Sequence, residues 1–442
     1  MTFDELHIAW AELDQLEGEE KHLTERLSVV HEKIKAHKAK IDILVKGRPP
    51  SINRLPLELL SQILVHSTLE PEFPERSFHA IACVSRRWRD VVLYTPTFWT
   101  SITVTPHQQL YRLRRQLKRS YASRLDIWIT GWRETYALEA SLDMILPHSI
   151  NWRTLTVSKN GIEATNFIFQ KIFLREFPSL REISVDSVSG SFVVPSFPLI
   201  ALTSLSPALR HLTLTPPFPW NKHAQSMCST LRTLDFTLPE AIPSPVIVKE
   251  FASSQSLTLL ILSGDDGAWS LKRDTLHFPL LEELRLRINR PTSFLEAIIA
   301  PRLEYVECTP YYYPMFSTIE GKFCDVGHLH FAPRSFNTED VVCLRRAFPA
   351  VRHVDLSIYH GFYFEGAQPP IDQWQNLETV TIYDLGRWWP DKSIERDRIV
   401  EWLRERQESG RPQLSVKLPG TRINEPEKFH LLRRYCNLEL LT

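Results

Sequence analysis

The sequence predicts an α/β protein in which a solenoid of parallel strands follows a small all-α segment and one long N-terminal helix. Three observations predict this order: a seven-residue apolar period in residues 5–45, two short amphipathic helices after it, and an apolar pattern that then recurs every 22 to 29 residues. The expected boundaries are a coiled-coil helix at 1–46, a linker at 47–54, a helical domain at 55–99 and a solenoid at 100–442.

Composition excludes several classes of protein. Lys plus Arg equals Asp plus Glu, at 52 each, so the net charge favours neither nucleic acid nor an anionic membrane as a partner. There is no apolar run of about eighteen residues, which predicts no membrane span. The six cysteines are scattered without a CxxC pair, as in proteins of the cytosol or nucleus. We therefore expect a cytoplasmic and/or nuclear protein without cofactors or metal.

Residues 5–45 keep a heptad pattern almost free of Pro and Gly. Ten of the twelve seam positions are apolar, which predicts a coiled-coil helix that the run GRPPS at 47–51 ends. With Leu6 at position a, the seam residues are Leu6, Ala9, Leu13, Leu16, Glu20, Leu23, Leu27, Val30, Ile34, His37, Ile41 and Leu44.

The charges flanking this seam favour one way of pairing. A parallel homodimer would place Glu12 against Glu17, whereas an antiparallel one places Glu12 beside Lys40 and Glu19 beside Lys33. The sequence thus predicts an antiparallel homodimer through residues 6–44. A heteromeric partner and a lone solvated helix are the alternatives.

The next segment, LPLELLSQIL and then AIACVSRRWRDVVLYTPTFW, contains two apolar stripes with helical spacing. Pro56 suits the start of the first helix, because its missing N–H would be unpaired there. We expect Trp88 to be largely buried between the two helices. The stripes consist of Leu59, Leu60, Ile63 and Leu64 in the first helix, and of Ile81, Val84, Trp88 and Val91 in the second.

This segment resembles an F-box, in the order LPxELL, VSRRW, Pro96 and Trp99. The link from His66 to His79 departs from the family by its length and its two prolines. The resemblance implies docking onto the adaptor subunit of an SCF-type cullin–RING ubiquitin ligase, and through it onto a cullin. The residues implied in adaptor binding are Leu55, Pro56, Leu59, Leu60, Ile63, Val84 and Trp88.

After the F-box, units of the form apolar, two variable, apolar, one variable, apolar predict short strands whose alternate residues face a shared core. The pattern resembles irregular leucine-rich repeats, without their asparagine ladder; an ordinary α/β domain is the alternative. We expect parallel strands in sequence order at 155–157, 183–185, 212–214, 234–236, 260–262, 284–286, 329–331, 354–356 and 380–382, and a last strand at 414–418.

The residues between the inward ones should form a polar open face. His328, His330, His353 and Asp355 fall at neighbouring positions there, where a metal site, a partner contact or plain solvation are the alternatives. Arg112, Arg114, Arg115, Lys118 and Arg119 give the helix near 110–120 a basic face.

Aromatic residues gather in the loops that leave the strands, so they should line one rim of the solenoid. Because aromatic side chains dominate binding hot spots, this rim is the predicted substrate site, although packing as core is the alternative for each ring. Its residues are Trp220, Trp269, Tyr311, Tyr312, Tyr313, Phe362, Tyr363, Trp388 and Trp389, with Phe316 and Phe364 beside them.

The resemblance to F-box proteins with leucine-rich repeats implies a non-enzymatic substrate-recognition adaptor of an SCF-type E3 ubiquitin ligase, whose solenoid captures an unknown protein substrate. The alternative is an F-box scaffold that is dimerised by its coiled coil and serves no ligase. A third alternative is an enzyme on an α/β fold, but the sequence contains no motif that positions a nucleophile.

Overall fold

The computed structural model of the protein divides into two units along the chain, residues 1–98 and residues 99–442. The structure describes residues 3–47, 52, 55–67, 74–187, 205–215, 230–238, 255–264, 271–309, 316–332, 338–356, 364, 369–383, 392–419 and 432–441.

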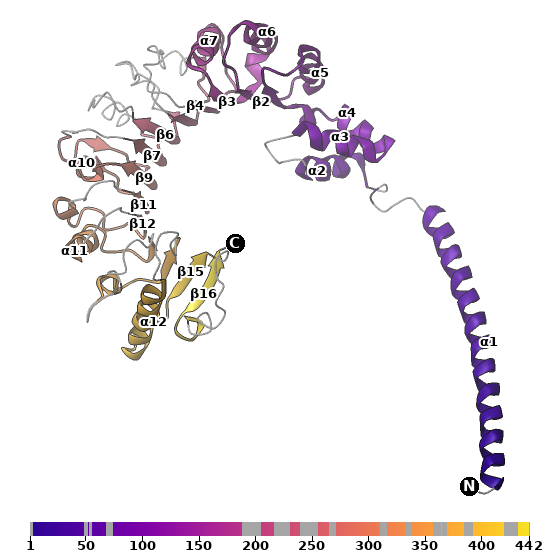
Figure 1. Cartoon of the computed structure of the whole chain (residues 1–442). Helices are drawn as coiled ribbons and strands as arrows, with labels where there is room; N and C mark the ends of the chain where they lie inside the picture. The colour runs from indigo at the N-terminus through magenta and orange to yellow at the C-terminus, as the bar shows by residue number, and fades with distance from the viewer. Residues whose placement is uncertain are drawn as a thin grey trace. The chain divides into compact units, whose positions relative to one another are not determined.

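The first unit begins with α1 (Phe3–Gly47), one uninterrupted helix of 45 residues (Figure 1). Its side chains from His7 to Leu44 are all exposed, the apolar seam included. None of the described helices combines enough length and apolarity to cross a lipid bilayer. The long helix is confirmed, and its described side chains are not covered by the rest of its unit.

Three helices follow α1 where the sequence predicts two. They are α2 (Leu57–Ser67), α3 (Pro74–Val84) and α4 (Arg86–Tyr94). The predicted second helix is divided at Ser85, whose extended backbone interrupts the helix and whose hydroxyl accepts a hydrogen bond from the N–H of Trp88, 3.2 Å away. The stripe from Ile81 to Val91 therefore lies on two helices.

The core of this helical segment is small. It contains Leu60 and Leu64 of α2, Val91 and Val92 of α4, and Phe98. Phe78 of α3 meets Phe98 edge to face, with 5.6 Å between ring centroids. Trp88 of α4 is of intermediate exposure, so part of its ring also lies in this core.

The second unit is built on a parallel sheet whose strands follow the order of the chain (Figure 1). All the predicted strand positions lie in this sheet, which confirms the solenoid. Its strands are β1 (Ser101–Val104), β2 (Leu125–Thr130), β3 (Trp152–Asn160), β4 (Glu182–Ser187), β5 (His211–Thr215), β6 (Thr233–Leu238), β7 (Leu259–Gly264), β9 (Glu283–Ile288), β11 (Tyr305–Cys308), β12 (His328–Phe331), β13 (His353–Leu356), β14 (Thr379–Ile382), β15 (Ser415–Pro419) and β16 (Asn437–Leu441).

Alternate strand residues explain why the repeats stack. The second and third anchors of each unit, such as Leu284 and Leu286, are fully buried and lie in register with Val306 and Cys308 on the next strand. Residues between them face the other side, which we call the open face. Each repeat therefore contributes one layer to a core that only its neighbours complete.

The return segments carry the remaining helices, drawn on the side of the strands away from the open face (Figure 1). A small parallel pair, β8 (Leu276–His277) with β10 (Ile298–Ile299), also lies among them. The helices are α5 (Leu110–Ser120), α6 (Tyr136–Ile145), α7 (Ile162–Ile172), α10 (Pro291–Ala297), α11 (Thr338–Ala347) and α12 (Lys392–Glu408), with short 3₁₀ helices at Leu146–Asn151, Phe316–Ile319 and Pro370–Gln373. Another 3₁₀ helix, Pro96–Trp99, precedes β1 in the sequence.

One asparagine provides a feature that the sequence reasoning missed. Asn160 is buried; its side-chain oxygen accepts the N–H of Trp132 at 2.8 Å, and its side-chain nitrogen donates to the carbonyl of Ile129 at 2.8 Å. It therefore satisfies two backbone groups as the chain leaves neighbouring strands. The sequence lacks a full asparagine ladder, yet one such position is present.

Candidate functional site

The helical segment exposes apolar side chains on α2 and at the end of α3. Leu59 and Ile63 lie one helical turn apart and are 48% and 47% exposed, while Val84 is 61% exposed. Leu60 and Leu64, on the other side of α2, are buried. The apolar residues of α2 thus divide into an inner set that forms the core and an outer set that faces solvent.

Side-chain hydrogen bonds hold this segment together where its core is thin. The Arg87 guanidinium donates to the carbonyl of Leu55 at the start of the segment. Arg89 Nε donates to the carbonyl of Ala82, 3.3 Å away, across the break between α3 and α4. Of the residues predicted to bind an adaptor, Leu60 therefore supports the fold, whereas Pro56, Leu59, Ile63 and Val84 are accessible.

The open face of the solenoid carries a charged cluster on β9 and β11. Arg287 Nε donates to Glu307 Oε1 at 2.8 Å, and Arg285 Nε lies 3.7 Å from Glu307 Oε2. Arg285 also pairs with Glu283 on its own strand. Glu307 is buried under these arginines, so the cluster presents two guanidinium groups whose charge is largely balanced.

A second cluster, centred on Asp355 of β13, lies on the neighbouring strands. His328 Nε2 donates to Asp355 Oδ2 at 2.8 Å, His330 Nδ1 is 3.7 Å from the same oxygen, and the Tyr383 hydroxyl is 3.4 Å away. Burial alone would raise the pKa of Asp355, but hydrogen bonds from His328, His330 and Thr381 hold that pKa well below its usual range. Asp355 is therefore ionised, and its carboxylate already has hydrogen-bond partners among the neighbouring side chains.

Aromatic rings join the two clusters. Tyr305 meets His328 edge to face at 4.7 Å, and His328 meets His353 in the same manner at 5.7 Å. Burial, followed by the nearby charge of Glu307, raises the pKa of the Tyr305 hydroxyl, which stays protonated as a hydrogen-bond donor. We call the residues Arg285, Arg287, Tyr305, Glu307, His328, His330, His353, Asp355 and Tyr383 the open-face patch.

The chemistry of the described residues favours binding. No group of three or more His, Cys, Asp or Glu side chains among them is arranged to hold a metal ion. Burial raises the pKa of the Cys308 thiol, and also that of Cys436 to about 11, so neither is a ready nucleophile. His328 and His330 are held by Asp355, and His353 meets the ring of His328 edge to face.

The aromatic rim predicted as the substrate site lies outside the described residues. Its members are Trp220, Trp269, Tyr311, Tyr312, Tyr313, Phe362, Tyr363, Trp388 and Trp389. Its two described neighbours, Phe316 and Phe364, are buried in the core. Phe316 meets Phe331 at 5.7 Å and Phe364 meets Trp402 at 5.0 Å. For these two rings the core alternative is the right one.

The basic residues predicted near 110–120 lie on α5. Leu113 and Leu117 are buried, while Arg112, Arg114, Arg115 and Lys118 are exposed. Arg119 stacks on Trp99, with its guanidinium carbon 4.5 Å from the ring centroid. An amphipathic helix with a basic outer face is therefore present.

Comparison with known proteins is consistent with this organisation. Residues 52–105 match the family model described as F-box-like. No curated protein matches the chain. Among solved structures, an internalin from Listeria monocytogenes is similar over 86% of this chain and 97% of that one, at 11% identity, but its TM-score of 0.32 is too low to bear on function. The chain thus carries an F-box-like segment, followed by a leucine-rich-repeat-like solenoid of parallel strands.

Proposed function

We propose that this protein is a substrate-recognition adaptor of an SCF-type ubiquitin ligase. The observation that carries the proposal is the F-box-like match at 52–105, together with Leu59, Ile63 and Val84, which remain exposed on its helices. F-box domains generally bind the adaptor subunit that connects them to a cullin. Such a protein belongs in the cytoplasm or nucleus, where cullin ligases act.

The adaptor contact is expected on the outer side of α2 and the end of α3. Several exposed apolar side chains close together mark an interaction surface. Burying each of them against a partner contributes roughly 1.5–3 kcal/mol to the binding free energy. Leu59 and Ile63 would provide the central contacts, with Pro56 and Val84 beside them. Leu60 acts indirectly, because it anchors α2 to the core.

Substrate capture is assigned to the solenoid. The open-face patch combines tyrosine, histidine and arginine side chains that are already fixed by ion pairs and ring contacts, so binding orders few new groups. Its balanced charge suits a polar protein surface. The aromatic rim remains part of this proposal as a second contact region.

The contribution to catalysis would be proximity alone. A substrate held on the solenoid while the F-box is bound to a ligase meets the ubiquitin-loaded enzyme in an effectively unimolecular step. No nucleophile or metal of this chain takes part in that mechanism.

The test uses the full chain and the purified adaptor–cullin pair. Leu59→Asp with Ile63→Asp should weaken adaptor binding at least roughly a hundredfold, because two buried contacts would become two desolvated charges. The matched control is Gln62→Asp with His66→Asp, which places the same charges on exposed polar positions of α2. Equal binding by both double variants would refute the F-box assignment.

The alternative function, a scaffold that binds the adaptor without a ligase role, gives a different result in a second assay. Under the proposal, the wild-type chain supports cullin-dependent ubiquitin transfer to a protein that the solenoid retains, and Leu59→Asp with Ile63→Asp abolishes this transfer. Adaptor binding without any transfer, on the chain or on a retained protein, would favour the scaffold.

A further inference from the structure

The long helix α1 presents an apolar stripe that nothing else in its unit covers. Its large seam residues are between 44% and 61% exposed although they repeat over the whole helix. A single helix gains nothing from such a stripe in water, so the pattern indicates a partner of similar length. These residues are Leu13, Leu16, Leu23, Leu27, Val30, Ile34, Ile41 and Leu44.

The charges of α1 are separated along its length. Residues 3–25 contain eight acidic side chains and one basic one, while residues 26–47 contain six basic and two acidic ones. The dipole of an isolated helix favours acidic side chains in the first turn and basic ones in the last turn, but this effect does not extend along the rest of the helix. Charge separated over the full length fits best beside a helix of the same sequence that runs in the opposite direction.

We propose that α1 pairs with α1 of a second copy of this chain, as an antiparallel coiled coil. In the register that aligns the seams, Phe3 of one copy lies level with Gly47 of the other, so the two helices overlap from end to end. Leu23 then packs beside Leu27 of the second copy, and Leu16 beside Ile34.

The flanking charges agree with this register. Glu12 lies beside Lys40 of the second copy and Glu19 beside Lys33, and each contact occurs twice by symmetry. Three contacts oppose this register. Arg26 meets its own copy on the twofold axis, Glu20 enters the seam opposite Val30, and His37 enters it opposite Leu13. A parallel pair would instead place Glu12 against Glu17 and Lys33 against Lys38, with no compensating contact at those positions.

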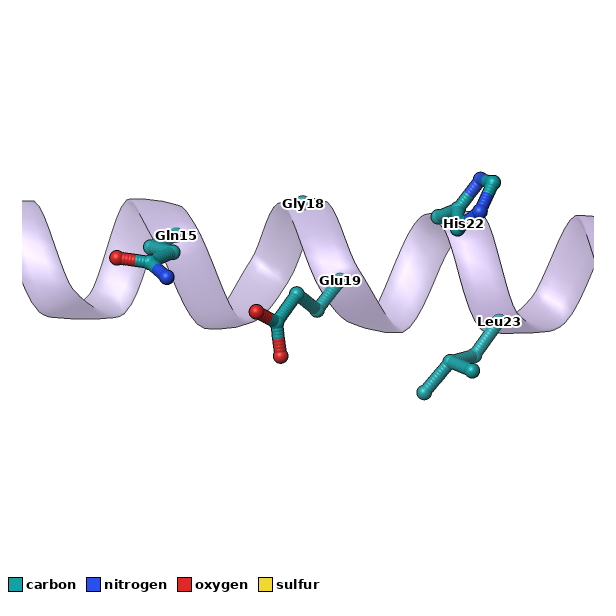
Figure 2. Close-up of a pocket in the computed structure, with 5 residues that line it drawn as sticks. All are labelled: Gln15, Gly18, Glu19, His22 and Leu23. Carbon is teal, nitrogen blue, oxygen red and sulfur yellow. The ribbon is translucent and has the colours of Figure 1, made fainter.

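The notch at Gly18 leaves the seam intact. Figure 2 shows this shallow pocket, lined by Gln15, Gly18, Glu19, His22 and Leu23. Leu23 projects from one side of the helix and His22 from the other, and a methyl group at Gly18 would meet nothing within 4 Å. Gly18 falls at an outward position of the heptad, so it faces away from the second copy.

Antiparallel pairing has a geometric consequence. A helix of 45 residues is about 67 Å long, so the two chains leave the coiled coil at opposite ends, about that far apart. If the proposed function holds, two ligase-bound F-boxes would be separated by this rod. The dimer itself can be tested without reference to the ligase.

The experiment measures the mass of the full chain by sedimentation at micromolar concentration. The wild type should be a dimer. Glu12→Lys with Glu19→Lys, and separately Lys33→Glu with Lys40→Glu, should each weaken self-association at least roughly tenfold, because every flanking pair becomes a like-charge pair. Mixing the two variants should restore a 1:1 dimer, since all four contacts are then attractive.

The controls apply the same charge changes away from the seam. Glu25→Lys with Glu32→Lys, and Lys21→Glu with Lys35→Glu, should leave the dimer intact. A parallel coiled coil predicts the opposite result. Each of the two charge-reversed double variants would remove one of the two repulsive contacts of a parallel pair, so it should self-associate more tightly than the wild type. The proposal would be overturned by a monomeric wild type, by charge-reversed double variants that self-associate as tightly as the wild type, or by a mixture of the two that stays monomeric.

Discussion

The solenoid and helix α1 contain the same kinds of apolar residue at regular spacing, yet only the solenoid buries them within one chain. In the solenoid, neighbouring repeats cover one another, so anchors such as Leu284 are fully buried. In α1 the period is equally regular, but no second helix of its unit covers the stripe. A repeat of the solenoid therefore completes its core within the chain, whereas the heptad repeat of α1 leaves its apolar side free for the second copy that we propose.

Charges follow the same division. On the open face, Glu307 and Asp355 are paired with arginines and histidines of adjacent strands. Among the described residues, none of the ion pairs involves the side chains of α1 between residues 7 and 44. The oppositely charged halves of α1 are therefore available to the second copy that we propose, while the open-face charges of the solenoid are already paired within the chain.

Removing a tryptophan from the solenoid should destabilise the protein far more than removing one from α1. Trp152 is fully buried against Phe177, at 5.1 Å between ring centroids, so Trp152→Ala should lower the free energy of unfolding of the solenoid by about 3–5 kcal/mol. Trp10→Ala, at a side chain 63% exposed on α1, should change it by less than about 0.5 kcal/mol. Urea denaturation followed by circular dichroism measures both. Equal losses would mean that α1 shares the core of the solenoid.

A medium effect concerns the carboxylate that the solenoid satisfies internally. The pKa of Asp355 is lowered in the folded protein, so its charge stabilises the fold above the unfolded pKa of about 3.9, and this stability is lost as the pH falls toward the folded value. Asp355→Asn should therefore cost about 1–3 kcal/mol near neutral pH, from weakened charge-assisted hydrogen bonds.

The difference in stability between wild type and Asp355→Asn should shrink below about pH 4, because the carboxylate of the unfolded wild-type chain takes up a proton there while the folded protein keeps it ionised. Urea midpoints at about pH 6 and pH 3 measure this change. Asp186→Asn, at an exposed carboxylate of β4, provides the control and should show little difference at either pH. A difference that stays constant with pH would show that Asp355 acts through packing alone.

Local patterns were sufficient to predict the solenoid from sequence. Each strand position follows from alternating anchors, and the parallel order follows from the fact that neighbouring repeats must stack. The last strand, β16, was not predicted, although Tyr435, Leu438 and Leu440 keep the spacing of the repeat. Asn160 was missed because a single asparagine shows no ladder, and its role depends on where the chain brings Trp132.

The helical segment and the candidate site were harder to predict. The helical spacing continues through Ser85, so periodicity alone could not show that an N-cap divides the stripe. The positions of His328 and His330 followed from strand alternation, but their hold on Asp355 depends on the register between repeats and on side-chain rotamers. The aromatic loops carry no periodic signal, which left the choice between rim and core open for each ring.

The smallest expected effect concerns the one like-charge contact on the proposed twofold axis of α1. Arg26 would meet Arg26 of the second copy, so Arg26→Gln should tighten the dimer by about 0.2–0.5 kcal/mol, roughly twofold in affinity. Arg26→Glu should bring no such gain, because the new charge again meets itself, whereas a mixture of wild type and Arg26→Glu should favour the heterodimer. In a parallel pair residue 26 faces His31 instead, so Arg26→Glu would then be at least as favourable as Arg26→Gln. Sedimentation equilibrium at low salt, where screening is weakest, separates the two arrangements: self-repulsion that does not depend on the sign of the charge requires a residue that lies on a symmetry axis.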